Sequence, residues 1–442
     1  MMKRALLILL AATAYGANWP AWRGPTADGL SSEKNLPVEW DAQHNIAWKV
    51  NLPGLGTSTP IVWDDLVILT SQIGDGPIEG RARNNFGGPL ARKSGTPGRV
   101  RFAVQAYSAR DGKLAWEHVF DAEGELPNVH LMHNLSTPSC VTDGSMVYAW
   151  FGNGQLVALD MKGKLVWSRH IGREYSSFQV LWGHGSSPLL DKDHLILLCD
   201  HQSAGYLLAL DKRTGKEIWK ADRGVDRRSY TTPFVIPGAS PAGDQIVINS
   251  DQRIDVYNAA TGELTWHVGE PAQAVVPSPV LHDGILYTSR GYTSGPYFAV
   301  PTDGKGDANS RIKWEVKTGA PYVSSLLYSD GVIYMATEVG VATAVDAADG
   351  KTLWKERLGG VFSASPVAAD GKVYFLNEDG ETTVIAAGRE SKVIARNKLE
   401  ERMLASLSIS NGRIFMRSDD HLFCIAAKPS AATPPQSHTP KP

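Results

Sequence analysis

The sequence predicts an all-β protein that folds as an eight-bladed β-propeller with four antiparallel strands in each blade. Three features lead to this fold class. A step of small residues and proline recurs along the chain, Asp-Gly or Asn-Gly turns follow most of these steps, and tryptophans end the units at intervals of 40 to 52 residues. A repeat of about 40 to 50 residues with four strands is typical of propellers.

Composition excludes several other classes of protein. The chain has 442 residues, of which 43% are hydrophobic and 20% charged, so it is not mostly disordered. Lys and Arg number 44 against 46 Asp and Glu, which gives a net charge of −2. This balance provides no general basic surface, and we therefore predict no nucleic-acid partner.

The first strand of each unit follows the small-residue step. A β-branched or leucine-rich run comes directly after most of these steps, which is typical of a buried strand. The eight steps are Ser58-Thr-Pro60, Ser136-Thr-Pro138, Ser186-Ser-Pro188, Thr231-Thr-Pro233, Pro277-Ser-Pro279, Ser324-Ser-Leu326, Ala364-Ser-Pro366 and Ala405-Ser-Leu407.

The second strand of each unit begins after a tight turn. Asp-Gly and Asn-Gly between alternating apolar runs are strong hairpin signals, because both residues tolerate the required backbone angles. The turns with this signal are Asp143-Gly144, Asp283-Gly284, Asp330-Gly331, Asp370-Gly371 and Asn411-Gly412.

A third strand and a turn lead into a fourth strand that ends in tryptophan, and the count of fourth strands predicts how the ring closes. The tryptophans are Trp116, Trp167, Trp219, Trp266, Trp314 and Trp354, and a degenerate unit follows at Ser391-Lys-Val-Ile-Ala395. There are eight first strands but only seven fourth strands after them. Asn45-Ile-Ala-Trp48 lies upstream and has the missing pattern. We expect this N-terminal strand around Trp48 to complete the last blade and so remove an exposed edge.

One unit reads Ala209-Leu-Asp211, Thr214-Gly-Lys216 and then Trp219. This pattern resembles the pyrroloquinoline quinone (PQQ) repeat family, and the resemblance covers about residues 45–427. It implies the quinoprotein alcohol dehydrogenase-like propeller fold. Trp19-Pro-Ala-Trp-Arg-Gly-Pro25 with Leu52-Pro-Gly-Leu-Gly56 resembles an exported bacterial group of this family whose function is not established. The blade count is similar to that of the periplasmic propeller lipoprotein of outer-membrane assembly.

The two ends of the chain predict export and a disordered tail. Residues 1–16 resemble a signal peptide, with Lys3 and Arg4, an apolar core and small residues before a cleavage point near Ala17. No apolar segment is long enough to span a membrane, and no cysteine follows the core for lipidation. We therefore expect a periplasmic or secreted protein with an N-terminal extension at 17–44. Residues 428–442 are rich in Pro, Ser and Thr and are expected to be disordered.

Propeller geometry predicts where a ligand or partner would bind. The loops that lead into first strands and the hairpins between second and third strands share one face, so polar residues there are binding candidates. Arginines suit carboxylates, phosphates or acidic partners, unless Asp200 and Asp251 neutralise them internally. The candidates are His184, Asp200, Arg227, Arg228, Asp251, Arg253, Arg290, Tyr292 and Glu338.

The first unit carries an insertion at 74–101. Pro60 and Pro138 are 78 residues apart, which is longer than any other unit. Long loops in compact domains are either functional or mobile. The insertion is interpreted as a flap over the same face that contacts an acidic partner or ligand, or as a solvated basic loop. Its basic residues are Arg81, Arg83, Arg92, Lys93 and Arg99.

These features favour a binding or scaffolding module for a protein partner or an anionic ligand. The alternative is a divergent PQQ-dependent oxidoreductase, for which the resemblance implies an adjacent cysteine pair and Ca²⁺ beside an aspartate. Cys140, Cys199 and Cys424 lie far apart, and the run Asp303–Asn309 has Lys305 where a calcium loop needs an oxygen ligand. PQQ with calcium is therefore not supported by motifs, and neither catalytic residues nor metal ligands are predicted. The sequence does not determine the oligomeric state.

Overall fold

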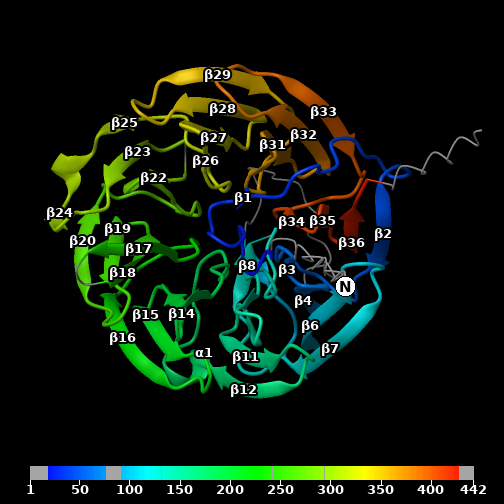
Figure 1. Ribbon diagram of the computed structural model, residues 1–442. Helices are drawn as coiled ribbons and strands as arrows, with labels where there is room; N and C mark the ends of the chain where they lie inside the picture. The colour runs from blue at the N-terminus through cyan, green and yellow to red at the C-terminus, as the bar shows by residue number, and fades with distance from the viewer. Residues whose placement is uncertain (1–17, 76–90, 131, 241–242, 293, 428–442) are drawn as a thin grey trace, which may run out of the picture.

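Eight sheets are arranged in a ring (Figure 1). Each contains four antiparallel strands, and two of them carry an additional short strand at one edge. The computed structural model describes residues 18–75, 91–130, 132–240, 243–292 and 294–427. The predicted signal peptide and C-terminal tail lie outside these residues. No helix in the described ranges has both the length and the apolar character needed to cross a membrane.

The blades follow one another in chain order around the ring. Blades 1 to 4 consist of β3 (Ile61–Trp63), β4 (Leu66–Gly74), β6 (Val100–Ser108), β7 (Leu114–Asp121); β9 (Val141–Thr142), β10 (Met146–Trp150), β11 (Gln155–Asp160), β12 (Leu165–His170); β13 (Leu189–Asp191), β14 (His194–Cys199), β15 (Gly205–Asp211), β16 (Glu217–Gly224); and β17 (Phe234–Ser240), β18 (Gly243–Asn249), β19 (Ile254–Asn258), β20 (Leu264–Val268).

Blades 5 to 8 consist of β21 (Val280–His282), β22 (Ile285–Ser289), β23 (Tyr297–Pro301), β25 (Trp314–Val316); β26 (Leu327–Ser329), β27 (Val332–Ala336), β28 (Val341–Asp346), β29 (Thr352–Arg357); β30 (Val367–Ala369), β31 (Lys372–Leu376), β32 (Glu381–Ala386), β33 (Val393–Lys398); and β34 (Ser408–Ser410), β35 (Arg413–Arg417), β36 (His421–Ile425), β2 (Ile46–Asn51). The remaining short elements are β1 (Leu30–Ser31), β5 (Ala91–Lys93), β8 (Asn128–His130), β24 (Gly306–Asp307), helix α1 (Ile171–Glu174) and a 3₁₀ turn (Asn309–Arg311).

Burial differs between the inner and outer strands of a blade. The middle strands β14 and β15 are buried at nearly every position, because neighbouring blades cover both of their faces. The outer strand β16 instead alternates between exposed and buried residues. This difference explains why continuous apolar runs and alternating runs follow one another in every unit.

The N-terminal strand closes the ring, as predicted. Strand β2 pairs antiparallel with β36, with Trp48 opposite Cys424, and Figure 1 shows the two strands side by side. The indole N–H of Trp48 donates a hydrogen bond of 3.0 Å to the carbonyl oxygen of Ala109 in blade 1. Blade 8 is thus built from both ends of the chain, which leaves its outer edge paired.

Five of the six other repeat tryptophans connect successive blades in the same way, whereas the indole N–H of Trp266 donates to the side-chain oxygen of Gln245 in its own blade. The indole N–H of Trp116 donates to the carbonyl oxygen of Met161 at 3.0 Å, and that of Trp167 donates to Lys212 at 3.1 Å. Gly163 has φ +80°, and a Cβ atom there would lie 2.6 Å from the ring of Trp116. Gly163 is therefore needed both for the turn and for contact with the preceding blade's tryptophan, and Gly215 and Gly262 meet Trp167 and Trp219 in the same way.

A ring of hydroxyl groups joins the inner strands and explains the small-residue step. In each of seven bonds of 2.9 to 3.1 Å, a backbone N–H of one blade donates to the hydroxyl of the next blade. The residues, in order from donor to acceptor, are Thr59, Ser139, Ser187, Thr232, Ser278, Ser325, Ser365 and Ser406. A small hydroxyl side chain is needed because blades approach closely near the axis.

Replacing one member of this ring should destabilise the protein. Ser278 is buried, and its Oγ accepts from the N–H of Thr232 and donates to the carbonyl oxygen of Thr232 at 2.9 Å. We expect Ser278→Ala to lower the free energy of unfolding by about 1–3 kcal/mol, because a buried N–H loses its acceptor. Urea denaturation measures the loss. The control Ser145→Ala, at an exposed turn, should change stability by less than about 0.5 kcal/mol. Equal losses in the two variants would contradict the role given to the ring.

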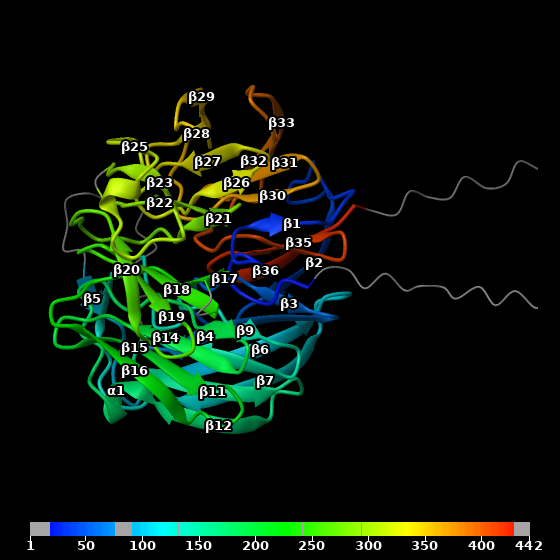
Figure 2. The ribbon, with the colours of Figure 1, turned by 60° about the vertical axis from the view of Figure 1, so that its left-hand side comes forward.

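The segment between Trp19 and Ser31 crosses the ring on one face. Trp19 forms a bridge with Val62 in blade 1, and Leu30 and Ser31 in β1 pair parallel with β30 in blade 7. Arg23 is buried, and its Nη2 donates to the carbonyl oxygen of Leu326 at 2.6 Å. Figure 2 shows β1 and β5 on opposite sides of the ring. The N-terminal segment thus covers the face opposite β5, and the face that carries β5 is open to other contacts.

Candidate functional site

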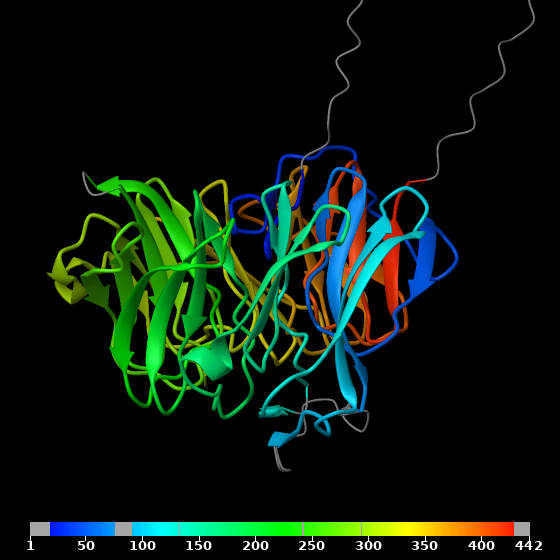
Figure 3. The same ribbon diagram turned by 90° about the horizontal axis from the view of Figure 1, so that it is seen from below.

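One face of the ring gathers the hairpins between second and third strands and the loops that lead into first strands. We call this face the mouth face. The β4–β6 connection lies here, and its strand β5 pairs with β8 in the loop before blade 2. Figure 3 shows this insertion below the ring, opposite the N-terminal segment. The sequence-predicted site residues in blades 3 to 6 belong to hairpins and loops of the same kind.

A buried ion cluster lies between blades 3 and 4. Arg223, near the end of β16, binds Asp200 in a bidentate manner, with Nε–Oδ1 at 2.7 Å and Nη2–Oδ2 at 3.0 Å. Its Nη1 lies 3.1 Å from Oδ2 of Asp255 in β19, and all three side chains are fully buried. Burial alone would lower the pKa of Arg223, but Asp200, Tyr257 and Asp255 outweigh it and raise the pKa. This cluster is therefore charged and internally paired.

Two predicted arginines join the same cluster through Asp255. Nη1 of Arg227 lies 3.2 Å from Oδ2 of Asp255, and Nε of Arg253 lies 2.7 Å from Oδ1. The sequence candidates did not include Asp255 or Arg223. The signal for Asp255 was a carboxylate inside the apolar strand Ile254-Asp-Val-Tyr-Asn258, where burial requires a cationic partner.

The remaining arginine candidates have other partners. Arg228 is 38% exposed and pairs with Asp226 at 3.3 Å. Arg290 is buried and donates to the side-chain oxygen of Asn249 and to the carbonyl oxygen of Glu270. Desolvation lowers the pKa of Arg290 to about 10. Arg227 and Arg253 thus share one internal carboxylate, Arg290 has neutral partners, and Arg228 is the most exposed member of the predicted arginine sector.

Three other predicted residues lie elsewhere around the mouth face. His184 is buried, its ring centroid is 4.3 Å from that of Trp150, and desolvation lowers its pKa to about 3. It is a neutral packing residue at ordinary pH. Tyr292 packs against Tyr322 with ring centroids 5.0 Å apart. Glu338 lies in the β27–β28 hairpin of blade 6, away from the ion cluster.

The basic insertion is described only in part. Arg81 and Arg83 lie outside the described residues. Arg92 belongs to β5, which pairs with β8, while Lys93 and Arg99 are exposed to solvent. The insertion therefore adds positive charge to the mouth face beside blade 1.

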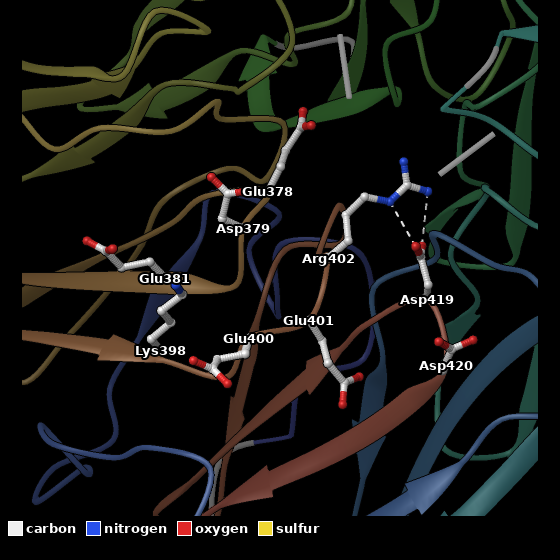
Figure 4. Close-up of a pocket in the computed structure, with 9 residues that line it drawn as sticks. All are labelled: Glu378, Asp379, Glu381, Lys398, Glu400, Glu401, Arg402, Asp419 and Asp420. Atoms are coloured by element: carbon white, nitrogen blue, oxygen red, sulfur yellow. Dashed lines mark hydrogen bonds and ion pairs between the residues drawn. The ribbon is translucent and has the colours of Figure 1, made fainter. Parts of the chain in front are cut away.

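An acidic cleft of about 560 Å³ opens between blades 7 and 8 on the mouth face (Figure 4). Seven acidic and two basic side chains line it. Glu401 accepts from Lys49 at 2.7 Å and pairs with His421 at 2.8 Å, while Arg402 binds Asp419 at 2.8 Å. The sequence candidates included none of the loop 398–402. The lining residues are Glu378, Asp379, Glu381, Lys398, Glu400, Glu401, Arg402, Asp419 and Asp420.

Exposed apolar side chains form a second feature of the mouth face. Most large exposed hydrophobic residues lie on outer strands, such as Val166 on β12. Three aliphatic residues instead lie at tips of mouth-face loops: Leu181 at 40% exposure, Val225 at 69% and Val339 at 63%. Apolar tips within a charged surface are typical of protein contact sites.

The described residues do not fit a calcium-bound quinone. Cys140, Cys199 and Cys424 are buried in three different blades. Within the described ranges, no three His, Cys, Asp or Glu side chains are grouped to hold a metal ion. Asp200 and Asp255, the buried mouth carboxylates, are already bound to arginines.

Comparison with known proteins agrees with the repeat pattern and the fold. A family model described as outer membrane protein assembly factor BamB matches residues 30–203, 176–306 and 302–391. BamB of Moranella endobia is 26% identical over 218 residues, which cover 45% of this chain and 52% of that protein. The chain spans about half the length of the curated BamB relatives it matches.

Two solved structures share the propeller fold. BamB from Moraxella catarrhalis matches with a TM-score of 0.59 and 16% identity, covering 86% of this chain and 98% of that chain. Quinohemoprotein alcohol dehydrogenase from Comamonas testosteroni matches with a TM-score of 0.61 and 12% identity, covering 96% and 82%. Both likenesses concern the fold alone. Because the family model matches most of the ring, this chain belongs to the PQQ-repeat family described as outer membrane protein assembly factor BamB.

Proposed function

We propose that this protein is an exported scaffold that binds a protein partner on its mouth face. The observation that carries the proposal is the set of apolar loop tips, Leu181, Val225 and Val339, on that face. Burying an exposed valine side chain contributes about 1.5–3 kcal/mol, so a few such residues supply much of the affinity of a modest interface. Membership of a family described as an assembly factor supports the same function.

Charge on the mouth face would orient the partner. The acidic cleft lies at blades 7 and 8, whereas the exposed Arg228 lies across the ring at blade 4. Opposite charges at separate places on one face favour a single docking orientation and raise the association rate. A partner with a basic region over the cleft and an acidic region over Arg228 matches this pattern.

Mutation of the apolar tips tests the proposal. We expect the double variant Val225→Asp, Val339→Asp to capture its partner from a periplasmic extract at least about tenfold more weakly than the unmodified protein. Quantitative pull-down followed by mass spectrometry measures this. The control Val166→Asp changes an equally apolar residue, 51% exposed, on the outer strand β12. Equal capture by the double variant and the control, with melting temperatures unchanged, would exclude these tips as the docking site.

The alternative function is quinone-dependent oxidation, and a quinohemoprotein alcohol dehydrogenase shares the propeller fold with this chain. Within the described ranges, however, no three His, Cys, Asp or Glu side chains are grouped to hold a metal ion, and Asp200 and Asp255 are already bound to arginines.

A further inference from the structure

Backbone hydrogen bonds join the loops of blades 4 and 5 at the mouth face. The N–H of Asp251 donates to the carbonyl oxygen of Arg228 at 3.0 Å, and the carbonyl oxygen of Asp251 accepts from Ala272 at 2.6 Å. Gln273 then forms an antiparallel bridge with Tyr292. These backbone bonds fix the positions of the side chains that the loops carry.

Several polar atoms in these loops are buried and lack partners. Arg228 Nε, Asp251 Oδ1 and Glu338 Oε2 have no hydrogen-bond partner within the described part of the chain. Leaving a buried polar group unpaired costs about 1–3 kcal/mol, so a molecule that pairs these atoms would gain affinity from them. The set combines one donor with two acceptors, and therefore suits a ligand whose groups both donate and accept.

Tyrosine rings lie beside these atoms. Tyr292 and Tyr322 pack at 5.0 Å, and Tyr292 is 39% exposed, so the cluster borders solvent. Burial raises the pKa of Tyr322, and the nearby Tyr292 and Glu338 raise it further. The hydroxyl of Tyr230 is buried close to Arg228 and Asp251. Tyrosine rings therefore lie beside both a positively charged side chain, Arg228, and negatively charged ones, Asp251 and Glu338.

The chemistry of this cluster points to one class of ligand. Sugar hydroxyls donate and accept hydrogen bonds, and the C–H faces of a pyranose pack against aromatic rings. An anionic ligand suits the cluster less well, because Asp226 already pairs with Arg228 and Asp251 lies beside it. We propose that Tyr292, Tyr322, Arg228, Asp251 and Glu338 form a binding site for a neutral saccharide. This site is independent of the proposed docking function, because it needs no protein partner.

Direct titration of the purified full chain tests this inference. Maltotriose, cellotriose and triacetylchitotriose, each at up to millimolar concentration, serve as probes, with calorimetry and intrinsic fluorescence as readouts. We expect saturable binding of at least one trisaccharide. Tyr292→Ala and Glu338→Gln should each weaken that binding by at least about tenfold. The matched control is Tyr328→Ala, which removes a tyrosine stacked on His282 at 4.0 Å beside the Asp330-Gly331 turn on the opposite face.

Each outcome of the titration decides the matter. Binding that is lost in Tyr292→Ala and Glu338→Gln but kept in Tyr328→Ala supports the site, provided that melting curves show all three variants folded. Absence of binding to every trisaccharide would mean that only water pairs the buried atoms, and would overturn the inference. Binding that is equal in all variants, or binding of lysine or acetate in place of sugars, would overturn it too.

Discussion

Deletion of residues 18–51 is expected to cause aggregation or a large fall in melting temperature. This change removes β2 and leaves the edge of β36 unpaired in blade 8. It also removes Trp48, which is buried against Phe415 and donates to Ala109 in blade 1. Loss of a buried tryptophan side chain alone costs about 3–5 kcal/mol, before the lost strand is counted. Differential scanning calorimetry measures the effect.

A single substitution at Trp48 tests its contribution to ring closure without deleting the whole N-terminal segment. We expect Trp48→Ala to lower the free energy of unfolding by about 3–5 kcal/mol, whereas Trp48→Phe should restore part of the loss because it keeps the ring contact. The control is Trp22→Ala, which changes a partly exposed tryptophan in the same N-terminal segment. If Trp48→Ala were no more damaging than Trp22→Ala, the N-terminal strand would not be what holds the ring closed.

Removal of the Asp255 carboxylate is expected to have the next largest effect on stability. Asp255 is fully buried and binds Arg223, Arg227 and Arg253, so Asp255→Asn leaves the nearly buried Arg227 without a counter-charge and leaves Arg223 with Asp200 alone. Breaking a buried ion pair by removing one partner costs about 3–5 kcal/mol. Urea denaturation at neutral pH measures the loss in the free energy of unfolding.

An exposed ion pair of the same kind provides the control. Asp226 pairs with Arg228 at 3.3 Å, and its side chain is 67% exposed. Asp226→Asn should change stability by less than about 1 kcal/mol, because exposed pairs contribute little. A similar small change in Asp255→Asn would show that solvent reaches the cluster and that the arginines are available to an external ligand.

The sequence by itself determined the blade architecture. Tight turns such as Asp283-Gly284 and Asp330-Gly331 set hairpins through local backbone angles, and repetition of the tryptophans made the count of units reliable. The strand around Trp48 could be assigned to the last blade because a missing fourth strand left only one candidate. These signals act over a few residues, so they survive without knowledge of the tertiary structure.

Only the tertiary structure decided which side chains meet. The sequence placed Arg227 and Arg253 on one face. Their partner Asp255 lies in strand β19, and Arg223, which also binds Asp255, lies in strand β16. Neither residue follows a turn signal in the sequence. The acidic cleft likewise joins hairpins of blades 7 and 8 that are about 40 residues apart in sequence. Pairing of charges depends on distances and burial across blades, and a one-dimensional repeat fixes only the blade to which each residue belongs.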